Sequence, residues 1–162
     1  MPVRSLLSAK TEAMLNDAYS NELAASHLYR HLAIQLHRNG WFGAASYFSG
    51  ESREELTHAD RISDFMDGRG TVAKVGNVAA VNDKLADLRD AIEIAYQTEL
   101  DLERKYVSGY SGCDDEITRQ FLLWFLEEQR KSVAKYSDLI ARLDAVADDK
   151  TAMLLIDKEL SA

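Results

Sequence analysis

A glutamate and a histidine three residues apart, Glu55 and His58, are the first candidates for chemistry in this chain. On a helix this spacing places both side chains on one face, one turn apart. Phe48 and Ile62, seven residues before and after Glu55, indicate that this face is apolar and points into a core. Because a buried carboxylate without a partner is costly or becomes protonated, a positive group is expected inside.

Three other polar side chains interrupt apolar helical stripes in the same way: Glu22, Glu99 and Gln129. Each has an apolar or aromatic residue seven positions before and after it, and each lies near the middle of its expected helix. Any one of them alone is better explained as a half-exposed residue at the rim of a core. Because the midpoints of bundled helices share one height, four helices with this feature favour a single metal-binding layer.

The types of these side chains narrow the choice of metal. Carboxylates with one imidazole and no thiolate favour iron or manganese over copper or a structural zinc site. Three carboxylates leave a net charge of about +1 around two divalent ions, and again around two trivalent ions bridged by an oxide. The layer therefore suits redox cycling with O2. Without metal, at least one carboxylate is expected to be protonated.

The elements that must position these residues are long helices, because apolar residues recur at three- and four-residue spacing and the only proline is Pro2. Segment 68–82, with three glycines, is expected to cross over along the bundle. The sequence predicts an all-α, four-helix bundle with one long crossover and a short fifth helix. The expected helices are 6–38, 41–67, 83–110, 114–146 and 151–160.

Several local signals support these boundaries. Ser8 is expected to cap the first helix, and Asn39 with Gly40 to end it. Residues 153–156 are four consecutive apolar side chains, too many for one face of a short helix. This run suggests that the fifth helix meets a partner surface.

Composition limits the class of protein. The 162 residues are expected to form one domain, 1–162. The net charge of −8 argues against binding to nucleic acid or an anionic membrane, and no apolar run is long enough to span a bilayer. Cys113 is the single cysteine and cannot form an intrachain disulfide. With no signal-peptide pattern, a cytoplasmic location is expected.

Several motifs together resemble the non-haem, cage-forming ferritins over nearly the whole chain. They are Leu28-Tyr29, the run EELTH at 54–58, Trp124 through Glu128-Gln129, and LIDKEL at 155–160. The resemblance implies ferroxidase activity, in which Fe(II) is oxidised by O2 or H2O2 and stored as a ferric oxide mineral. It also implies a homo-oligomeric shell of 24 subunits, with the fifth helix lining the four-fold axes.

The family pattern implies two irons per subunit, with the metal ligands also forming the catalytic site. Glu22, Glu55 and His58 would hold the first iron. Glu55 would bridge to a second iron, held also by Glu99 and Gln129. The second Glu-x-x-His motif of bacterioferritins is absent, because residues 129–132 read QRKS. The di-iron site is thus expected to be heavy-chain-like.

The resemblance also implies a role for Tyr29 beside the two irons, as a hydrogen-bond donor or a one-electron source. Leu56 stands where bacterioferritins have their haem-binding methionine, so no haem is expected. Lys131 and Ser132 stand where many bacterial ferritins have two glutamates for a third iron. That version of the third site is therefore expected to be missing.

Glu51 offers a substitute, because it lies four residues before Glu55 and projects from the same inner face. The hypothesis is that Glu51 binds a third iron, or passes iron between the pair and the cavity, with Glu54 as a second candidate. A solvated residue in an acidic patch is the competing interpretation.

Asp114, Asp115 and Glu116 carry two interpretations: they draw Fe²⁺ into three-fold pores, or they cap a helix. Other classes of protein also stay open. They are another di-iron carboxylate enzyme, such as an oxygenase or a rubrerythrin-like peroxidase; a helical interaction protein with accidental core acids; and a small cage with metal sites between subunits.

Overall fold

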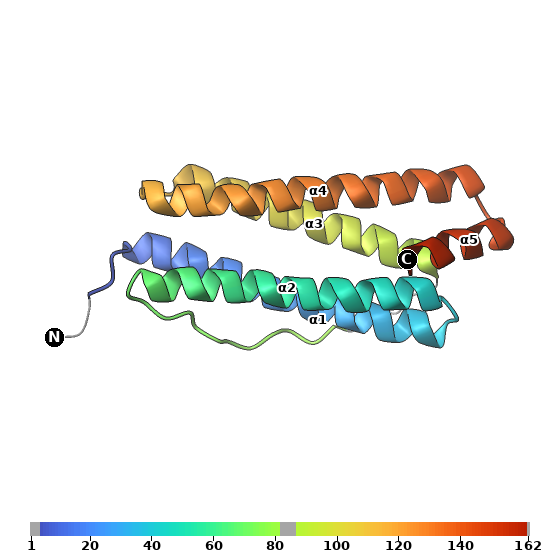
Figure 1. Ribbon diagram of the computed structural model, residues 1–162, viewed down its shortest axis with the longest axis horizontal. Helices are drawn as coiled ribbons and strands as arrows, with labels where there is room; N and C mark the ends of the chain where they lie inside the picture. The colour runs from blue at the N-terminus through green and yellow to red at the C-terminus, as the bar shows by residue number, and fades with distance from the viewer. Residues whose placement is uncertain (1–3, 82–86, 162) are drawn as a thin grey trace.

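The protein is an all-α bundle in a computed structural model that describes residues 4–81 and 87–161. These ranges contain five helices and no strand: α1 (Ala9–Arg38), α2 (Phe42–Gly68), α3 (Leu88–Gly112), α4 (Glu116–Val146) and α5 (Lys150–Leu160). The long helices α1 to α4 lie side by side, with α5 at the end of the bundle where α4 finishes (Figure 1). The predicted four-helix bundle with a short fifth helix is confirmed.

Capping sets the start of α1 three residues later than predicted. Ser8 Oγ accepts a hydrogen bond from the Thr11 amide at 3.2 Å, so the helix begins at Ala9 rather than at residue 6. At the other end, Asn39 is the C-cap and Gly40 has a φ of +89°, which glycine adopts without strain. Because this turn is so short, α1 and α2 are antiparallel neighbours, as predicted.

The crossover after α2 runs along the α1–α2 side of the bundle (Figure 1). Residues 71–81 have no helix or strand, and the Lys74 amide donates to Asn16 Oδ1 on α1 at 2.7 Å. Ala73 packs against the core, so this segment is a strap tied to the bundle, as predicted. Its expected last residue, 82, lies outside the described residues.

Helix α3 differs from its prediction at both ends. Asp87 and Asp90 form a capping box, so the helix begins at Leu88, and the predicted start at residues 83–86 lies outside the described residues. The helix continues to Gly112, past the break expected after residue 110. Gly109 lies within this helix, and its missing side chain lets Met14 of α1 approach closely; an added Cβ would lie 3.1 Å from Met14 Sδ.

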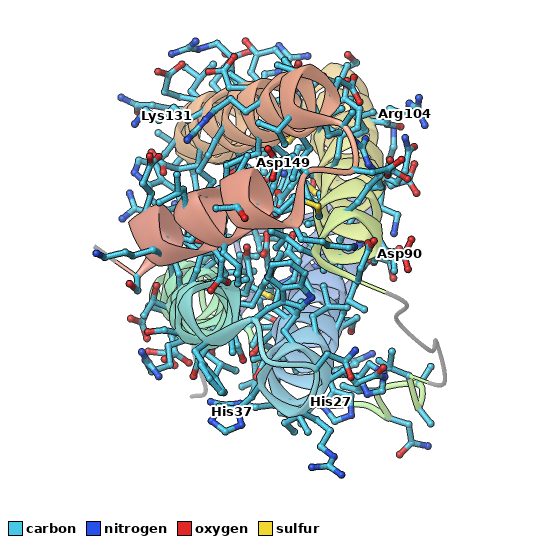
Figure 2. All side chains as sticks on the ribbon, turned by 90° about the vertical axis from the view of Figure 1, so that its right-hand side faces the viewer. His27, His37, Asp90, Arg104, Lys131 and Asp149 are labelled. Atoms are coloured by element: carbon cyan, nitrogen blue, oxygen red, sulfur yellow. The ribbon has the colours of Figure 1, made fainter. Side chains whose placement is uncertain are left out.

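Helix α5 docks on the N-terminus of α2 through Asp157. This carboxylate accepts hydrogen bonds from the Gly43 amide at 3.1 Å and the Ala44 amide at 2.7 Å. A Cβ on Gly43 would lie 1.7 Å from the Asp157 carbonyl oxygen, so only glycine fits there. In the view along the bundle, α5 crosses in front of the helix ends, and labelled residues such as His37 and Lys131 point outward (Figure 2).

The apolar core falls into two clusters along the bundle. One lies toward α5 and includes Leu32, Phe48 and Tyr136; the other lies toward the far end and includes Leu15, Ile62 and Leu122. On α1, α2 and α4, the residues of one cluster precede those of the other, with a buried polar residue between them. On α3, the buried Glu99 lies between Ala95 and Leu102, which both belong to the first cluster, and Tyr106 of the second cluster follows. None of the described helices is long and apolar enough to cross a membrane.

Candidate metal centre

Five predicted ligands lie in the polar layer between the two apolar clusters, and all of them are buried. Their exposed fractions are 0% for Glu22, 4% for Glu55, 7% for His58, 1% for Glu99 and 2% for Gln129. The prediction that these side chains face inward from four different helices is therefore confirmed. Tyr29 is also fully buried.

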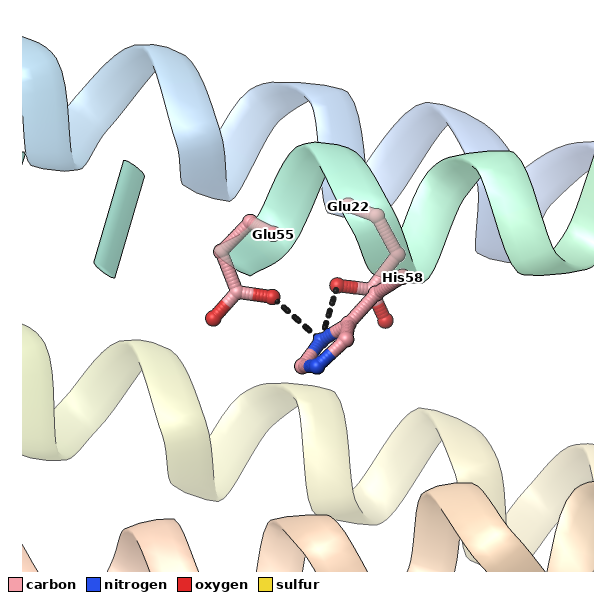
Figure 3. A group of neighbouring side chains, drawn as sticks. All are labelled: Glu22, Glu55 and His58. Carbon is pink, nitrogen blue, oxygen red and sulfur yellow. Dashed lines mark hydrogen bonds and ion pairs between the residues drawn. The ribbon is translucent and has the colours of Figure 1, made fainter. Parts of the chain in front are cut away.

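Glu22, Glu55 and His58 form the tightest group (Figure 3). His58 Nδ1 lies 2.8 Å from Glu55 Oε2 and 3.7 Å from Glu22 Oε2. One ligand atom from each residue lies within 4.8 Å of the others, which is the spacing of a site that could hold a metal ion. The three residues predicted to share the first iron are thus brought together by α1 and α2.

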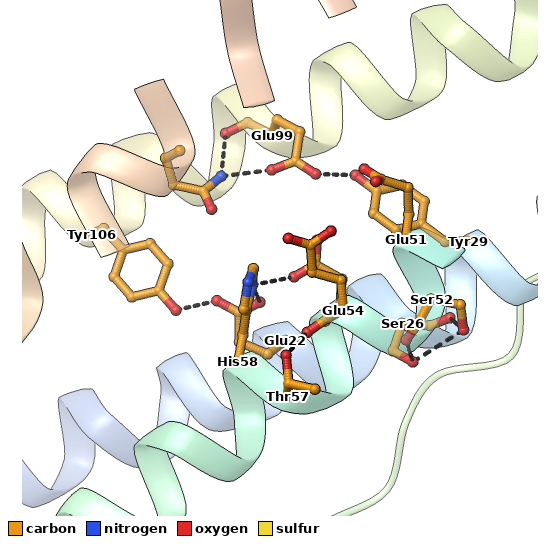
Figure 4. A network of polar contacts seen from close by, with 12 residues as sticks. Glu22, Ser26, Tyr29, Glu51, Ser52, Glu54, Thr57, His58, Glu99 and Tyr106 are labelled. Atoms are coloured by element: carbon orange, nitrogen blue, oxygen red, sulfur yellow. Dashed lines mark hydrogen bonds and ion pairs between the residues drawn. The ribbon is translucent and has the colours of Figure 1, made fainter. Parts of the chain in front are cut away.

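Glu99, Gln129 and Tyr29 form a second group on the other side of the layer (Figure 4). Gln129 Nε2 donates to Glu99 Oε2 at 2.7 Å, and the Tyr29 hydroxyl donates to Glu99 Oε1. The two groups are close enough to interact, because the charge on Glu99 contributes to raising the pKa of Glu55. The division of these ligands between two irons stays a prediction.

The layer is held at its sides by contacts that the sequence did not point to. The Tyr106 hydroxyl of α3 donates to Glu22 Oε1, at the opposite end of the layer from Tyr29 (Figure 4). Ser26 Oγ donates to the Ser52 carbonyl at 2.6 Å and Ser52 Oγ to the Ser26 carbonyl at 2.8 Å, which fixes α1 against α2. Tyr106 lies seven residues after Glu99, a spacing that marks only an inward-facing aromatic ring, and no motif in the sequence marks its hydroxyl.

The layer has one group that can carry positive charge, His58, for its three carboxylates. Burial raises the pKa of Glu55 well above its usual range, although the hydrogen bond from His58 lowers it, and burial likewise raises the pKa of Glu99. For His58, burial lowers the pKa, but the nearby carboxylates of Glu22 and Glu55 outweigh it and bring the pKa to about 10. Glu22 Oε2 is buried and accepts no hydrogen bond from the described residues.

Glu51 is buried at 9% exposure on the inner face of α2, as predicted, but it is not part of either group. Its Oε2 accepts hydrogen bonds from Lys135 Nζ at 2.8 Å and from the Tyr136 hydroxyl at 3.0 Å. Glu54 is exposed, unlike Glu51. Binding of a third iron at Glu51 stays a prediction.

Two residues of the acidic run at the start of α4, Asp114 and Asp115, make hydrogen bonds that stabilise the fold. Asp115 is the N-cap of α4 and accepts from the Thr118 amide at 2.9 Å. Asp114 Oδ1 accepts from the Thr11 hydroxyl at 3.0 Å, which joins the start of α4 to the start of α1. The capping interpretation is confirmed for Asp115, and the pore interpretation stays a prediction.

The chemistry open to this layer follows from its donors. Oxygen and imidazole ligands, without a thiolate among them, suit iron or manganese. The aromatic ring of Trp124 packs edge-on against the His58 imidazole, with centroids 5.3 Å apart, and helps to exclude water from this side. A cation bound between the carboxylates would supply the missing positive charge.

Comparisons with known proteins agree with this geometry. The model of the ferritin-like domain family matches residues 12–146. The chain is 28% identical to the bacterial non-haem ferritin of Staphylococcus aureus (strain USA300), over 97% of this chain and 96% of that protein. It is also 28% identical to the bacterial non-haem ferritin of Staphylococcus saprophyticus, over 91% of this chain and 90% of that protein.

Solved structures give the same result. An open-pore ferritin from the archaeon Archaeoglobus fulgidus superposes with a TM-score of 0.93 and 28% identity, over 96% of this chain and 97% of that chain. A humanized archaeal ferritin superposes with a TM-score of 0.92 and 26% identity, over 96% of each chain. The matched family, the fold and the buried ligand layer agree: the chain belongs to the ferritin family, as a non-haem ferritin.

Proposed function

We propose that this protein stores iron after oxidising Fe²⁺ at the buried layer. Membership of the ferritin family supports iron storage. The oxidation step rests on one observation: Glu22, Glu55 and His58 present ligand atoms within 4.8 Å of one another in a core that is short of positive charge. A carboxylate-rich site of this kind binds Fe²⁺ and holds Fe³⁺ more strongly as the ion gains charge.

Two iron ions per chain fit the two groups of ligands. Glu22, Glu55 and His58 would hold the first ion, and Glu99 with Gln129 the second, with Glu55 between them. The hydrogen bond from Gln129 Nε2 to Glu99 holds this pair in register before metal arrives. The raised pKa values of Glu55 and Glu99 mean that iron binding releases protons from the site.

The reaction balances with either oxidant. Two Fe²⁺ ions each give one electron to O2, which takes up two protons and leaves as H2O2. With H2O2 as the oxidant, the two Fe²⁺ ions again give one electron each. The H2O2 takes up two protons, its O–O bond breaks, and two water molecules form. Tyr29 donates to Glu99 and so lies where it can support the second iron as a hydrogen-bond donor or supply one electron.

The same proposal extends to assembly and storage. Leu154 and Leu155 of α5 are 53% and 60% exposed, whereas Met153 and Ile156 on its other side are buried. A homo-oligomeric cage of 24 subunits, acting in the cytoplasm, would cover the exposed leucines against neighbouring copies of α5. The ferric product would then collect as a mineral inside the cage.

An anaerobic Fe²⁺ titration of the metal-free protein, followed by air, tests this function. We expect two irons per chain in the first oxidation phase, then a growing ferric absorbance from mineral inside a particle whose size by light scattering fits a cage. Stoichiometric oxidation in a small particle without mineral would favour a di-iron enzyme instead. No iron binding at the layer would favour a helical interaction protein.

A further inference from the structure

Glu51 and Glu55 lie one turn apart on α2, but Glu55 shares the imidazole of His58 with Glu22, whereas Glu51 is paired with a lysine. The ammonium group of Lys135, from α4, lies 2.8 Å from Glu51 Oε2. The Tyr136 hydroxyl donates to the same oxygen at 3.0 Å. Lys135 Nζ is also 5.1 Å from the ring centres of Tyr47 and Tyr136, and both rings favour a cation at that position.

Lys135 reaches Glu51 from the surface. Its side chain is 39% exposed and lines an open pocket of approximately 540 Å³ formed by α2, α4 and α5. A lysine has a long, flexible stem, so its ammonium group can leave Glu51 for solvent without moving the buried part of the core. Glu51 itself is 9% exposed and cannot follow.

The pocket around Lys135 is lined mainly by basic side chains, each of which is paired with a carboxylate. Four cationic side chains line it, against one acidic one, Asp138; the four are Arg130, Lys131, Lys135 and Arg142. A divalent ion that approaches Glu51 through this pocket must compete with the ammonium group already in place, 2.8 Å from Glu51 Oε2. The charge on Glu51 also acts on the nearby layer. After burial, it is one of the causes that raise the pKa of Glu99 and of Tyr29.

We propose that Glu51 marks a third cation position whose resting occupant is the ammonium group of Lys135, so that a divalent metal binds there only by displacing this lysine. Lys135 is a positioning residue: it holds a positive charge beside the proposed two-metal centre, on which this inference rests, and it weakens binding of a third ion. The position would take a hard divalent cation such as Fe²⁺, because its acceptor is a carboxylate.

Zinc binding to the assembled, metal-free protein tests this by isothermal titration calorimetry, with Zn²⁺ as a redox-inert probe. Wild type should bind two Zn²⁺ per chain tightly and a third weakly. Lys135→Gln should tighten the third site by about tenfold or more, because an uncompensated buried carboxylate is left for the metal. Lys135→Arg should stay close to wild type, and Lys135→Gln/Glu51→Gln should lose the third site.

Lys131→Gln is the matched control, because Lys131 lies one turn away on α4, lines the same pocket and pairs with Glu128 instead. It should leave the third site unchanged. Equal third-site affinity in wild type and Lys135→Gln would overturn the proposal, as would a third site that survives Glu51→Gln. If the wild-type protein did not bind the first two Zn²⁺ ions, that result would instead contradict the proposed two-metal centre. Failure of this inference and failure of the proposed function are therefore distinguishable.

Discussion

Two sets of buried carboxylates in this bundle differ in how their charge is neutralised. Asp157 accepts two backbone N–H groups at the N-terminus of α2, where the helix dipole favours an anion. Glu51 has the Lys135 ammonium group. Glu22, Glu55 and Glu99 have two tyrosine hydroxyls, one amide and the single imidazole of His58.

This difference distinguishes carboxylates that stabilise the fold from carboxylates that are available to bind a metal ion. Neutral hydroxyl and amide donors satisfy hydrogen bonds but add no charge, so three carboxylates in the layer face at most one protonated imidazole. The negative charges of Asp157 and Glu51 are compensated by groups of the protein itself. The charges of the layer are compensated only when protons or metal cations are added. The predictions below test this contrast, from the largest expected effect to the smallest.

Glu55→Gln should have the largest effect, because Glu55 contacts His58 and lies between the two groups of ligands. We expect the initial rate of Fe²⁺ oxidation to fall by about 100-fold or more, since a neutral amide replaces the charged ligand. Stopped-flow absorbance of the ferric product measures this rate. Asp60→Asn, an exposed neutralisation on the same helix, is the control and should keep the wild-type rate.

Raising the pH should destabilise the metal-free protein. The folded state holds a proton on His58 up to a pKa of about 10, against an ordinary 6.5, and the pKa of Glu55 is raised too. The folded state therefore binds more protons than the unfolded chain, and stability falls as pH rises from about 6.5 towards 10. The difference between these two pKa values of His58 corresponds to a loss of up to about 5 kcal/mol, roughly 10–20 °C in Tm by calorimetry.

Zinc sharpens this pH experiment. Two bound Zn²⁺ ions supply the charge that the carboxylates lack, so the metal-loaded protein should lose much less stability over the same pH range. A Tm of the metal-free protein that climbs with pH would show that the layer does not retain protons.

Tyr29→Phe and Tyr106→Phe form a matched pair, since each removes one hydroxyl donor from one carboxylate of the layer. Each should slow Fe²⁺ oxidation by up to about tenfold, the effect of one hydrogen bond to a charged group. A much larger loss for Tyr29→Phe would assign Tyr29 the one-electron role. Wild-type rates in both variants would contradict the idea that these hydroxyls orient ligands.

Asp157→Asn should have the smallest effect, because an amide oxygen still accepts from the two backbone N–H groups but loses the negative charge at the helix N-terminus. We expect a loss of about 1 kcal/mol in the free energy of unfolding, measured by denaturant titration. Fe²⁺ oxidation should keep its rate. A slower rate would mean that the docking of α5 reaches the layer.

The sequence was sufficient for the parts of this structure that follow from helical periodicity. Glu22, Glu55, Glu99 and Gln129 stood out because each interrupts an apolar stripe, and the structure buries all four. The crossover could be recognised from its glycines and from the loss of helical spacing after residue 70. Element ends were less certain, since the Asp87 capping box and the helical Gly109 depend on local and tertiary contacts.

The partners of the layer could not be predicted. Tyr106 and Lys135 reach Glu22 and Glu51 from helices more than eighty residues away in sequence, and their own spacing marks only a core tyrosine and a surface lysine. Glu51 illustrates the limit: periodicity placed it on the inner face correctly, but only the packing of α4 against α2 shows that Lys135 already neutralises it.

The central claim, that the uncompensated carboxylates form a two-iron site, is tested most directly by crystals soaked anaerobically in Fe²⁺ and measured at the iron absorption edge. The account predicts two anomalous peaks per chain, one among Glu22, Glu55 and His58 and the other beside Glu99 and Gln129. Anomalous density confined to surface carboxylates, with the layer free of iron, would contradict it.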